Sequence, residues 1–437
     1  RKAGAAFKAL CPFHDEKTPS FNVNPRMGIF KCFGCGVGGN AFQFLMRHEG
    51  LNFREAVQFL ANRQGVDLSR YEGPGGEDQR PSTREKILAM NRRAADFFRA
   101  SLRGAEGARA RRYLAERGVS EEAEEAFQLG YAPARWDGLC RAAEKVGFSA
   151  EALSEAGLAV RREDGTGFYD RFRGRVMFPI QGPEGDVAGF GGRSLPGEED
   201  QPGGAKYLNS AETAVFKKGR ILYGFHQARE AIRSGKRVLV TEGYFDVISL
   251  WQGEVREAVA PLGTALTAEH LRVLRAHAEE IVFVFDPDAA GRAASGRAGD
   301  AAGSLLGLTG EPDRLLAGEV LRRSCYSREG IGACRRRVVN LPAGRDVDDL
   351  LRTEGPEKFE GLLERAEGLL DHTVRGALGE VGSAADQAEK VAAVRRLLPV
   401  LAACHQSVRD QYFALLEDQL GIPYPTVASM VTRMISE

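Results

Sequence analysis

Two short apolar segments that each run into acidic residues constrain the fold of this chain most strongly. Residues 237–240 are followed by Glu242, and residues 281–285 are followed by Asp286 and Asp288. Continuous runs of Val, Ile and Phe are typical of strands buried on both faces of a parallel sheet. Because ligand sites of open α/β sheets lie at the carboxyl ends of the strands, the sequence predicts an α/β sheet with acids at one edge.

A third apolar segment, 338–341, adds acids to the same predicted edge. Asp346 and Asp348 follow it, so as many as five carboxylates are expected to converge. Like charges at this density repel each other unless cations lie among them. Carboxylate oxygens suit Mg²⁺, which keeps waters and substrate phosphates as its other ligands, so the pattern predicts a magnesium site. A solvated acid after a strand is the alternative for any one position, but it explains three strand ends poorly.

The order Glu-Gly, Asp-x-Asp and Asp-x-Asp resembles the Toprim domain, which is shared by bacterial DnaG-type primases, type IA and type II topoisomerases and some nucleases. The resemblance implies metal-dependent phosphoryl transfer on nucleic acid, without choosing among these enzymes. It implies that three acids are catalytic, namely Glu242, Asp286 and Asp288. Together with Asp346 and Asp348, these acids are expected to hold the magnesium.

Two features depart from the Toprim pattern. Pro287 stands inside the Asp-x-Asp motif, where the family usually has a small residue, and it stiffens the loop without removing a ligand. The segment 308–337 resembles nothing in the family and is interpreted as an insertion. Cys325 and Cys334 lie in it, but no further clustered ligand accompanies them, so two ordinary thiols are favoured over a metal site.

Four residues near the N-terminus have the spacing of a zinc site. Cys11 and His14 form one pair and Cys32 and Cys35 form the other, with two residues inside each pair and seventeen between the pairs. Each pair fits a tight turn, which is how a tetrahedral Cys₃His site closes around a structural zinc ion. The residues between the pairs predict a two-stranded hairpin, which is too small to hold a core without metal.

The segment 11–36 resembles the zinc-binding domain of bacterial DnaG-type primases, which in that family precedes a Toprim-bearing RNA polymerase domain. The same order occurs here. Phe21, Phe30 and Phe33 lie among basic residues and are candidates for stacking on a single strand. For Phe21 and Phe30 the alternative is that they form the small core of the ribbon.

Basic residues lie between these two regions. Arg173 and Arg175 are two positions apart, so on an extended chain they share one face and are spaced to meet phosphates. Gly191 and Gly192 would let backbone amides approach a nucleotide closely. The segment 201–237 contains eight basic and two acidic residues, a local basic patch in a chain with 60 residues of each charge.

Four strings in the region 170–220 resemble the template-binding and nucleotide-binding segments of DnaG-type primases, which type IA topoisomerases lack. The resemblance implies contacts with template or incoming nucleotide by Arg173, Arg175, Arg193, Lys206 and Lys218. A solvated basic face is the alternative.

The predicted architecture is multidomain, α+β and α/β. It comprises a zinc ribbon, a linker, a mixed α/β basic subdomain, a Toprim α/β sheet domain and a C-terminal helical subdomain, at residues 1–70, 71–82, 83–235, 236–355 and 356–437. Seven Cys among 437 residues make no disulfide framework, and no apolar run has membrane length, so a cytoplasmic protein is expected. Because the chain opens with Arg1, it is interpreted as a fragment of a longer protein.

The predicted function is that of a DNA primase, a nucleotidyltransferase that makes short RNA primers from NTPs on single-stranded DNA. The resemblance implies one structural Zn²⁺, two or more catalytic Mg²⁺ or Mn²⁺ ions, and a monomer that binds no membrane. It also implies single-strand binding protein as a partner, and a replicative helicase bound through a C-terminal domain absent from this chain. Glu242 is either a metal ligand only or also the general base. The alternatives are a Toprim topoisomerase or nuclease and a non-catalytic DNA-binding relative.

Overall fold

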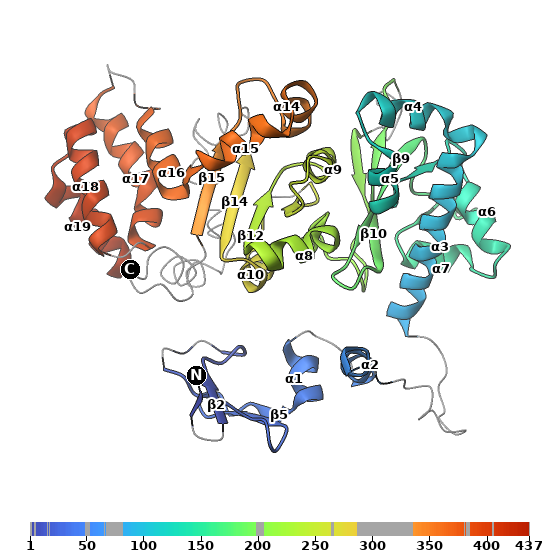
Figure 1. Cartoon of the computed structure of the whole chain (residues 1–437), viewed down its shortest axis with the longest axis horizontal. Helices are drawn as coiled ribbons and strands as arrows, with labels where there is room; N and C mark the ends of the chain where they lie inside the picture. The colour runs from blue at the N-terminus through green and yellow to red at the C-terminus, as the bar shows by residue number, and fades with distance from the viewer. Residues whose placement is uncertain are drawn as a thin grey trace. The chain divides into compact units, whose positions relative to one another are not determined.

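The computed structural model describes residues 2–3, 6–14, 16, 18–48, 53–64, 66, 82–197, 205–263, 266–285, 335–379, 381, 385–403 and 406–436. The chain forms two compact units, Arg1–Arg80 and Pro81–Glu437 (Figure 1). The division between them falls inside the predicted linker, most of which lies outside the described residues. No helix among the described residues is both long and apolar enough to span a membrane.

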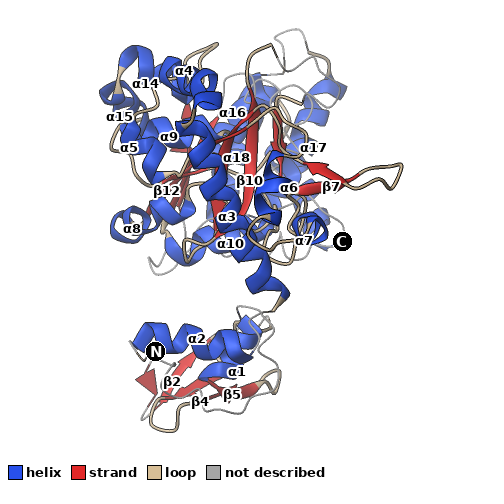
Figure 2. Ribbon diagram, turned by 90° about the vertical axis from the view of Figure 1, so that its right-hand side faces the viewer, coloured by secondary structure: helices blue, strands red, loops and turns tan. Residues whose placement is uncertain are grey.

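The described residues of the first unit form an antiparallel sheet in which each strand pairs with the next along the chain. The strands are β1 (Lys2–Ala3), β2 (Ala6–Ala9), β3 (Phe21–Asn24), β4 (Ile29–Cys32) and β5 (Gly38–Asn40). Two helices follow, α1 (Ala41–His48) and α2 (Phe53–Gln64), and α1 packs against β5 and β4 (Figure 2). The predicted hairpin is confirmed as β3 and β4. Asn40 caps α1, since its Oδ1 accepts a 3.0 Å hydrogen bond from the Gln43 amide.

The core of the first unit is a small aromatic cluster. Phe21 and Phe30 stack with ring centroids 5.2 Å apart and are 4% and 5% exposed, with Phe13 and Phe44 packed against them. The core interpretation of Phe21 and Phe30 is therefore confirmed. Phe33, which is 75% exposed, stays open to a partner.

The second unit begins with a helix on an antiparallel sheet. Ser82 and Glu85 form a capping box at the start of α3 (Thr83–Arg103), as each side chain accepts a hydrogen bond from the other residue's amide. The apolar face of α3 is buried on the sheet, where Phe98 meets Phe190 edge to face. Asn91, fully buried, donates to the carbonyls of Val187 and Ala188.

The described part of this antiparallel sheet has the strand order β11-β10-β9-β6. A separate hairpin is formed by β7 and β8. The elements of this region are η2 (Ala105–Gly107), α4 (Ala108–Glu116), α5 (Glu121–Ala126), β6 (Gly130–Ala132), α6 (Gly138–Glu144), α7 (Ala150–Glu155), β7 (Ala159–Arg161), β8 (Phe168–Asp170), β9 (Arg175–Gln181), β10 (Val187–Ser194) and β11 (Tyr207–Asn209).

The predicted α/β sheet is confirmed by a second sheet with the order β13-β12-β14-β15-β16, of which the first four strands are parallel. Its strands are β12 (Arg237–Val240), β13 (Ala258–Val259), β14 (Glu280–Phe285), β15 (Arg335–Asn340) and β16 (Glu367–Gly368). The helices around it are α8 (Phe225–Gly235), α9 (Tyr244–Gln252), α10 (Ala268–His277), α14 (Val347–Glu354) and α15 (Pro356–Glu364).

Strand β15 begins three residues earlier than the apolar pattern predicts. Arg335, Arg336 and Arg337, assigned to the insertion, pair in register with Glu280 to Val282 of β14. The last three residues of the predicted insertion are therefore part of the sheet, and the bounds of the insertion stay a prediction. Three consecutive arginines do not predict a strand from the sequence. In the structure, Arg337 is held by a hydrogen bond from its Nε to the Ala366 carbonyl at 3.0 Å. The rest of the insertion, with Cys325 and Cys334, lies outside the described residues.

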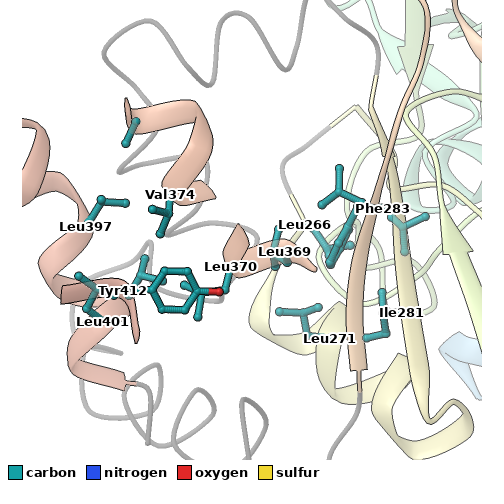
Figure 3. Packing of buried hydrophobic residues seen from close by; sticks show 14 of the residues in the cluster. Leu266, Leu271, Ile281, Phe283, Leu369, Leu370, Val374, Leu397, Leu401 and Tyr412 are labelled. Atoms are coloured by element: carbon teal, nitrogen blue, oxygen red, sulfur yellow. The ribbon is translucent and has the colours of Figure 1, made fainter. Parts of the chain in front are cut away.

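The C-terminal helices share a core with one face of the Toprim sheet. They are α16 (Leu369–Gly379), α17 (Gln387–Ala403), α18 (Gln406–Leu420) and α19 (Tyr424–Ser436). Figure 3 shows Ile281 and Phe283 of β14 within the same cluster as Leu370 and Tyr412. The sheet also takes its antiparallel strand β16 from beyond the predicted boundary at 355, so the residues up to 368 belong to the sheet layer.

Candidate zinc centre and acidic sheet edge

The four predicted zinc ligands come together in the first unit. Their ligand atoms all lie within 4.8 Å of one another, with 3.8 Å between the Sγ atoms of Cys11 and Cys35 and 3.7 Å between Cys32 Sγ and His14 Nδ1. Tetrahedral zinc, with bonds of about 2.3 Å to sulfur and 2.0 Å to nitrogen, requires separations of roughly 3.8 Å and 3.6 Å. The donor set and its spacing therefore fit a structural Cys₃His zinc site.

Glu16 orients this site and was not identified from the sequence. Its Oε2 lies 3.4 Å from Nε2 of His14, the ring nitrogen that does not face the cysteines. Its Oε1 accepts hydrogen bonds from the amides of Cys11, at 2.8 Å, and Ser20, at 2.9 Å. A carboxylate in this position fixes the orientation of a ligating histidine and makes it more basic. The available signal was an acid two residues after a histidine ligand.

The thiol of Cys32 is prepared to bind metal. Burial opposes its ionisation, but hydrogen bonds from the Ser20 hydroxyl and from the Cys35 and Gly34 amides lower the pKa of Cys32 to about 6. Because the thiolate is the form that binds zinc, this environment favours the ligand state at neutral pH.

In the second unit, the parallel strands carry acids to one edge of the Toprim sheet. Val240 of β12 lies opposite Phe283, and Phe285 lies opposite Asn340, so Glu242 and Asp346 follow strands on either side of β14. Glu242 is exposed, and Asp346 caps α14, its carboxylate accepting the Asp349 amide at 2.7 Å. Strand β14 ends at Phe285, and Asp286 and Asp288 lie outside the described residues.

Asp348 is buried, whereas Glu242 is exposed and Asp346 is partly exposed. It is 1% exposed, and its carboxylate accepts hydrogen bonds from Arg117 Nη1 and Ser249 Oγ, both at 2.7 Å. Since α14 begins at Val347, Asp346 is its cap and Asp348 falls in its first turn, which packs against α9. Protein groups thus engage the carboxylate of Asp348, and its predicted metal role stays a prediction.

Arg117 is a further residue that was not identified from the sequence. Its guanidinium lies 5.0 Å from the ring centroid of Phe245 in α9 and ion-pairs with Asp348 of α14. Arg117 lies in the segment between α4 and α5, which Gln252 of α9 also holds. The Gln252 side chain donates to the Gly118 carbonyl and accepts from the Ser120 amide. Nothing in the local sequence around Arg117 indicates this role, because both partners come from distant segments of the chain.

The predicted basic residues divide into buried and accessible groups. Arg175 and Arg193 are each 5% exposed; Arg175 donates to the Ala205 carbonyl at 2.8 Å, and Arg193 lies 5.0 Å from the Tyr207 ring. Lys206 is exposed, and Lys218 is partly exposed. Arg193 also donates from Nε to the Tyr113 hydroxyl at 3.3 Å, which places it in the interior beside α4.

The prediction that Arg173 and Arg175 share one face of a strand is wrong. Strand β9 begins only at Arg175, and Gly174 has a φ of +61°, a left-handed conformation that interrupts the extended chain. Arg173 therefore leaves the sheet and lies 4.4 Å from the ring centroid of Trp136.

The glycines of β10 serve packing instead of the predicted approach to a nucleotide. β10 is flanked by β9 and β11, so its amides lie within the sheet ladder. A Cβ on Gly191 would collide with the Tyr244 side chain, which lies directly on the strand. The Tyr244 hydroxyl donates to Asn209 Oδ1 at 2.6 Å. The absence of a side chain thus lets α9 pack closely against the basic sheet.

Three family models match the chain in succession. They are the CHC2 zinc finger at residues 1–74, the DNA primase catalytic core N-terminal domain at residues 97–229 and the Toprim domain at residues 236–309. A zinc ribbon followed by an antiparallel sheet and a Toprim sheet defines the class of Toprim proteins that carry a CHC2 zinc finger.

Relatives identify the family within that class. The DNA primase of Myxococcus xanthus is 40% identical over 424 residues, which are 96% of this chain and 64% of that protein. A crystal structure of the zinc-binding and RNA polymerase domains of Aquifex aeolicus primase is 30% identical, with a TM-score of 0.60 and coverage of 98% of this chain and 93% of that one. The chain belongs to the DnaG-type DNA primase family.

A third relative is a complex. The RNA polymerase domain of Mycobacterium tuberculosis primase DnaG, crystallised with a double-stranded DNA oligomer that has a 6-nucleotide overhang, is 32% identical with a TM-score of 0.59. The match covers 77% of this chain and 97% of that one. Against the curated relatives, by contrast, this chain spans less than two thirds of their length.

Proposed function

We propose that this chain synthesises short RNA primers on single-stranded DNA, as a nucleotidyltransferase that joins NTPs and releases pyrophosphate. One observation carries the proposal. Helix α9 begins two residues after the exposed acid Glu242, and its first residue, Tyr244, packs on Gly191, two residues before Arg193. A single helix thus joins the acidic sheet edge to the antiparallel sheet, whose strands β9 and β11 begin just after Arg173 and Lys206.

The acidic edge suits a divalent metal. Glu242 and Asp346 are the described residues that would hold Mg²⁺ or Mn²⁺, together with Asp286 and Asp288 from outside the described part. When bound, such ions neutralise charge on triphosphate oxygens and favour ionisation of the attacking 3′-hydroxyl. Asp348 is assigned a positioning role, because Arg117 and Ser249 engage its carboxylate. Glu242 is exposed, so it is accessible to a nucleotide from solvent.

The accessible basic residues are assigned to template and nucleotide. Lys206, Lys218 and Arg173 are proposed to contact phosphates, and the buried Arg175 and Arg193 to hold the local structure. The Mycobacterium tuberculosis relative crystallised with DNA supports a nucleic-acid ligand. A replicative helicase and single-strand binding protein are proposed partners from the family resemblance, and the protein is proposed to act as a cytoplasmic monomer.

Incorporation of labelled NTPs on a single-stranded template tests the proposal. Metal-dependent formation of RNA oligomers is expected, with supercoiled DNA left intact in a parallel nicking assay. Nicking or relaxation without RNA synthesis would instead indicate a Toprim nuclease or topoisomerase. Binding without either reaction would indicate a non-catalytic relative.

A further inference from the structure

Glu367 is the centre of a polar cluster between the Toprim sheet and the C-terminal helices. Its Oε1 accepts hydrogen bonds from Asn340 Nδ2, at 2.7 Å, and from His372 Nδ1, at 2.9 Å, and its Oε2 pairs with the guanidinium of Arg375. The Glu367 side chain is 16% exposed. Burial raises the pKa of this carboxyl, but the two hydrogen bonds and the nearby guanidinium lower it overall below its ordinary value. The group is therefore ionised at neutral pH.

Asn340 occupies the carboxyl end of β15, at the edge of the sheet that bears the acids. It pairs in register with Phe285 of β14, and Asp286 follows Phe285 directly in the sequence. On the other side of β15, the described pairing with β16 ends at Val338. The last turn of the ladder around Asn340 therefore has a strand on one side only. The side chain of Glu367 reaches Asn340 where this pairing has stopped.

The loop that follows Asn340 carries Asp346. Contacts at the far end of the loop attach it to α14, since the Asp346 carboxylate caps the helix and Arg345 Nη1 donates to Glu354 Oε1 at 2.6 Å. These contacts fix Asp346 relative to α14, but they do not fix it relative to β14. The hydrogen bond between Asn340 and Glu367 holds the other end of the loop, at the sheet.

Helix α16 supports the cluster from the side of the C-terminal helices (Figure 1). The helix packs on β15 and β16, and it supplies both His372 and Arg375. Asp371, in the first turn of α16, accepts a 2.6 Å hydrogen bond from the Tyr412 hydroxyl of α18. One ionised carboxylate thus joins the C-terminal helices to the sheet end of the loop.

We propose that Glu367 is a positioning residue for the metal-binding edge, and that it acts through Asn340 on the loop that carries Asp346. The inference rests on the proposed function, because it concerns the same proposed metal site. A group that orients a metal-bearing segment changes metal affinity without contacting the metal. Loss of the contact should therefore change metal affinity while the melting temperature stays close to that of wild type.

Binding of Mn²⁺ to the zinc-loaded chain, measured by electron paramagnetic resonance, tests the inference. Glu367→Ala and Asn340→Ala should each weaken Mn²⁺ binding roughly tenfold. Glu367→Gln should retain most of the affinity, because its amide oxygen still accepts from Asn340. The control is Glu364→Ala, which removes an exposed acid at the end of α15 and should bind Mn²⁺ as wild type does.

Asn340→Ala decides the test, because Asn340 is exposed and its substitution should leave the melting temperature unchanged. The double variant of Asn340 and Glu367 should bind Mn²⁺ as well as either single variant does, because both substitutions break the same contact. Wild-type affinity in Asn340→Ala, or additive losses in the double variant, would overturn the positioning role.

Primer synthesis by wild type is measured in parallel, and it separates the two proposals. Synthesis by wild type, with Mn²⁺ affinity unaffected in Asn340→Ala, refutes the positioning role alone. Weakened Mn²⁺ binding in both single variants, without synthesis by wild type, refutes the proposed function and leaves the positioning of a metal site.

Discussion

Arg117 and Asp348, separated by 231 positions in the sequence, are joined by a 2.7 Å hydrogen bond in which the guanidinium donates to a carboxylate that is 1% exposed. Arg352 lies 3.4 Å from the same oxygen, and Ser249 donates to the other. The pair fastens the first half of the second unit to α14, the helix that Asp346 caps at the acidic edge. We propose that Asp348 acts on the site by holding α14 in place.

Replacing Arg117 by Ala should lower the free energy of unfolding by about 3 kcal/mol, because it removes the main partner of a buried charge. Arg352 remains near the carboxylate and limits the loss. The matched control is Arg233→Ala, which breaks an exposed pair with Glu230 on α8 and should change stability by less than about 0.5 kcal/mol. Urea denaturation measures both variants. Equal stability of Arg117→Ala and wild type would contradict the role of this pair.

Gly191→Ala should destabilise the second unit by about 2 kcal/mol or more, since the new methyl group enters the space of the buried Tyr244 ring. Gly376→Ala is the control. Gly376 lies inside α16, and the position that a methyl group would take there has nothing within 4 Å, so the change should stabilise the helix by about 0.5 kcal/mol. Melting temperatures of the two variants should therefore move in opposite directions. An unchanged melting temperature in Gly191→Ala would show that α9 does not need this close approach.

Local patterns predicted much of the fold, since strands β12 and β14 and the two pairs of zinc ligands each depend on residues close together in sequence. Contacts made only by the tertiary fold were not predictable. Asp346 and Asp348 look equivalent as an Asp-x-Asp pair, yet one caps a helix and the other meets Arg117 from a distant segment. Gly191 was predicted to contact a nucleotide because a glycine allows close approach to the backbone. Nothing in the sequence reveals that Tyr244 occupies that space.

His270 should make stability depend on pH. It is fully buried, and burial lowers its pKa. The Thr267 amide donates to Nδ1, so Nε2 carries the hydrogen that is donated to the Ile221 carbonyl, at 3.2 Å each. Protonation would turn Nδ1 into a donor facing another donor. The folded-state pKa of His270 lies below the unfolded value of about 6.5. The free energy that the neutral His270 contributes to stability is therefore fully present above about pH 6.5 and is lost as the pH falls further.

The substitution His270→Gln isolates this effect, because glutamine stays neutral and keeps a donor near Ile221. Unfolding free energies are compared at pH 7 and pH 5. The loss on acidification should be smaller in the variant than in wild type. An identical loss in both proteins would show that His270 does not titrate on unfolding in this range.

Glu16→Gln should weaken zinc binding roughly 10- to 100-fold, because it removes the carboxylate beside Nε2 of His14. Competition with a chromophoric chelator measures the affinity. Glu144→Gln, at the exposed end of α6, is the control and should bind zinc as wild type does. Cys35→Ser should bind less zinc still, with the cooperative unfolding of the second unit unchanged. Wild-type zinc affinity in Glu16→Gln would show that Glu16 does not support zinc binding by His14.

We propose that acids at the carboxyl edge of the Toprim sheet catalyse metal-dependent RNA synthesis. The most direct measurement compares dinucleotide synthesis and template affinity in wild type, Glu242→Gln and the exposed α8 control Glu230→Gln. Wild type and Glu230→Gln should synthesise equally. Glu242→Gln should lose about a hundredfold in rate, corresponding to about 3 kcal/mol of transition-state stabilisation, with template affinity and melting temperature retained. Synthesis by Glu242→Gln at the wild-type rate would show that Glu242 is not a catalytic acid.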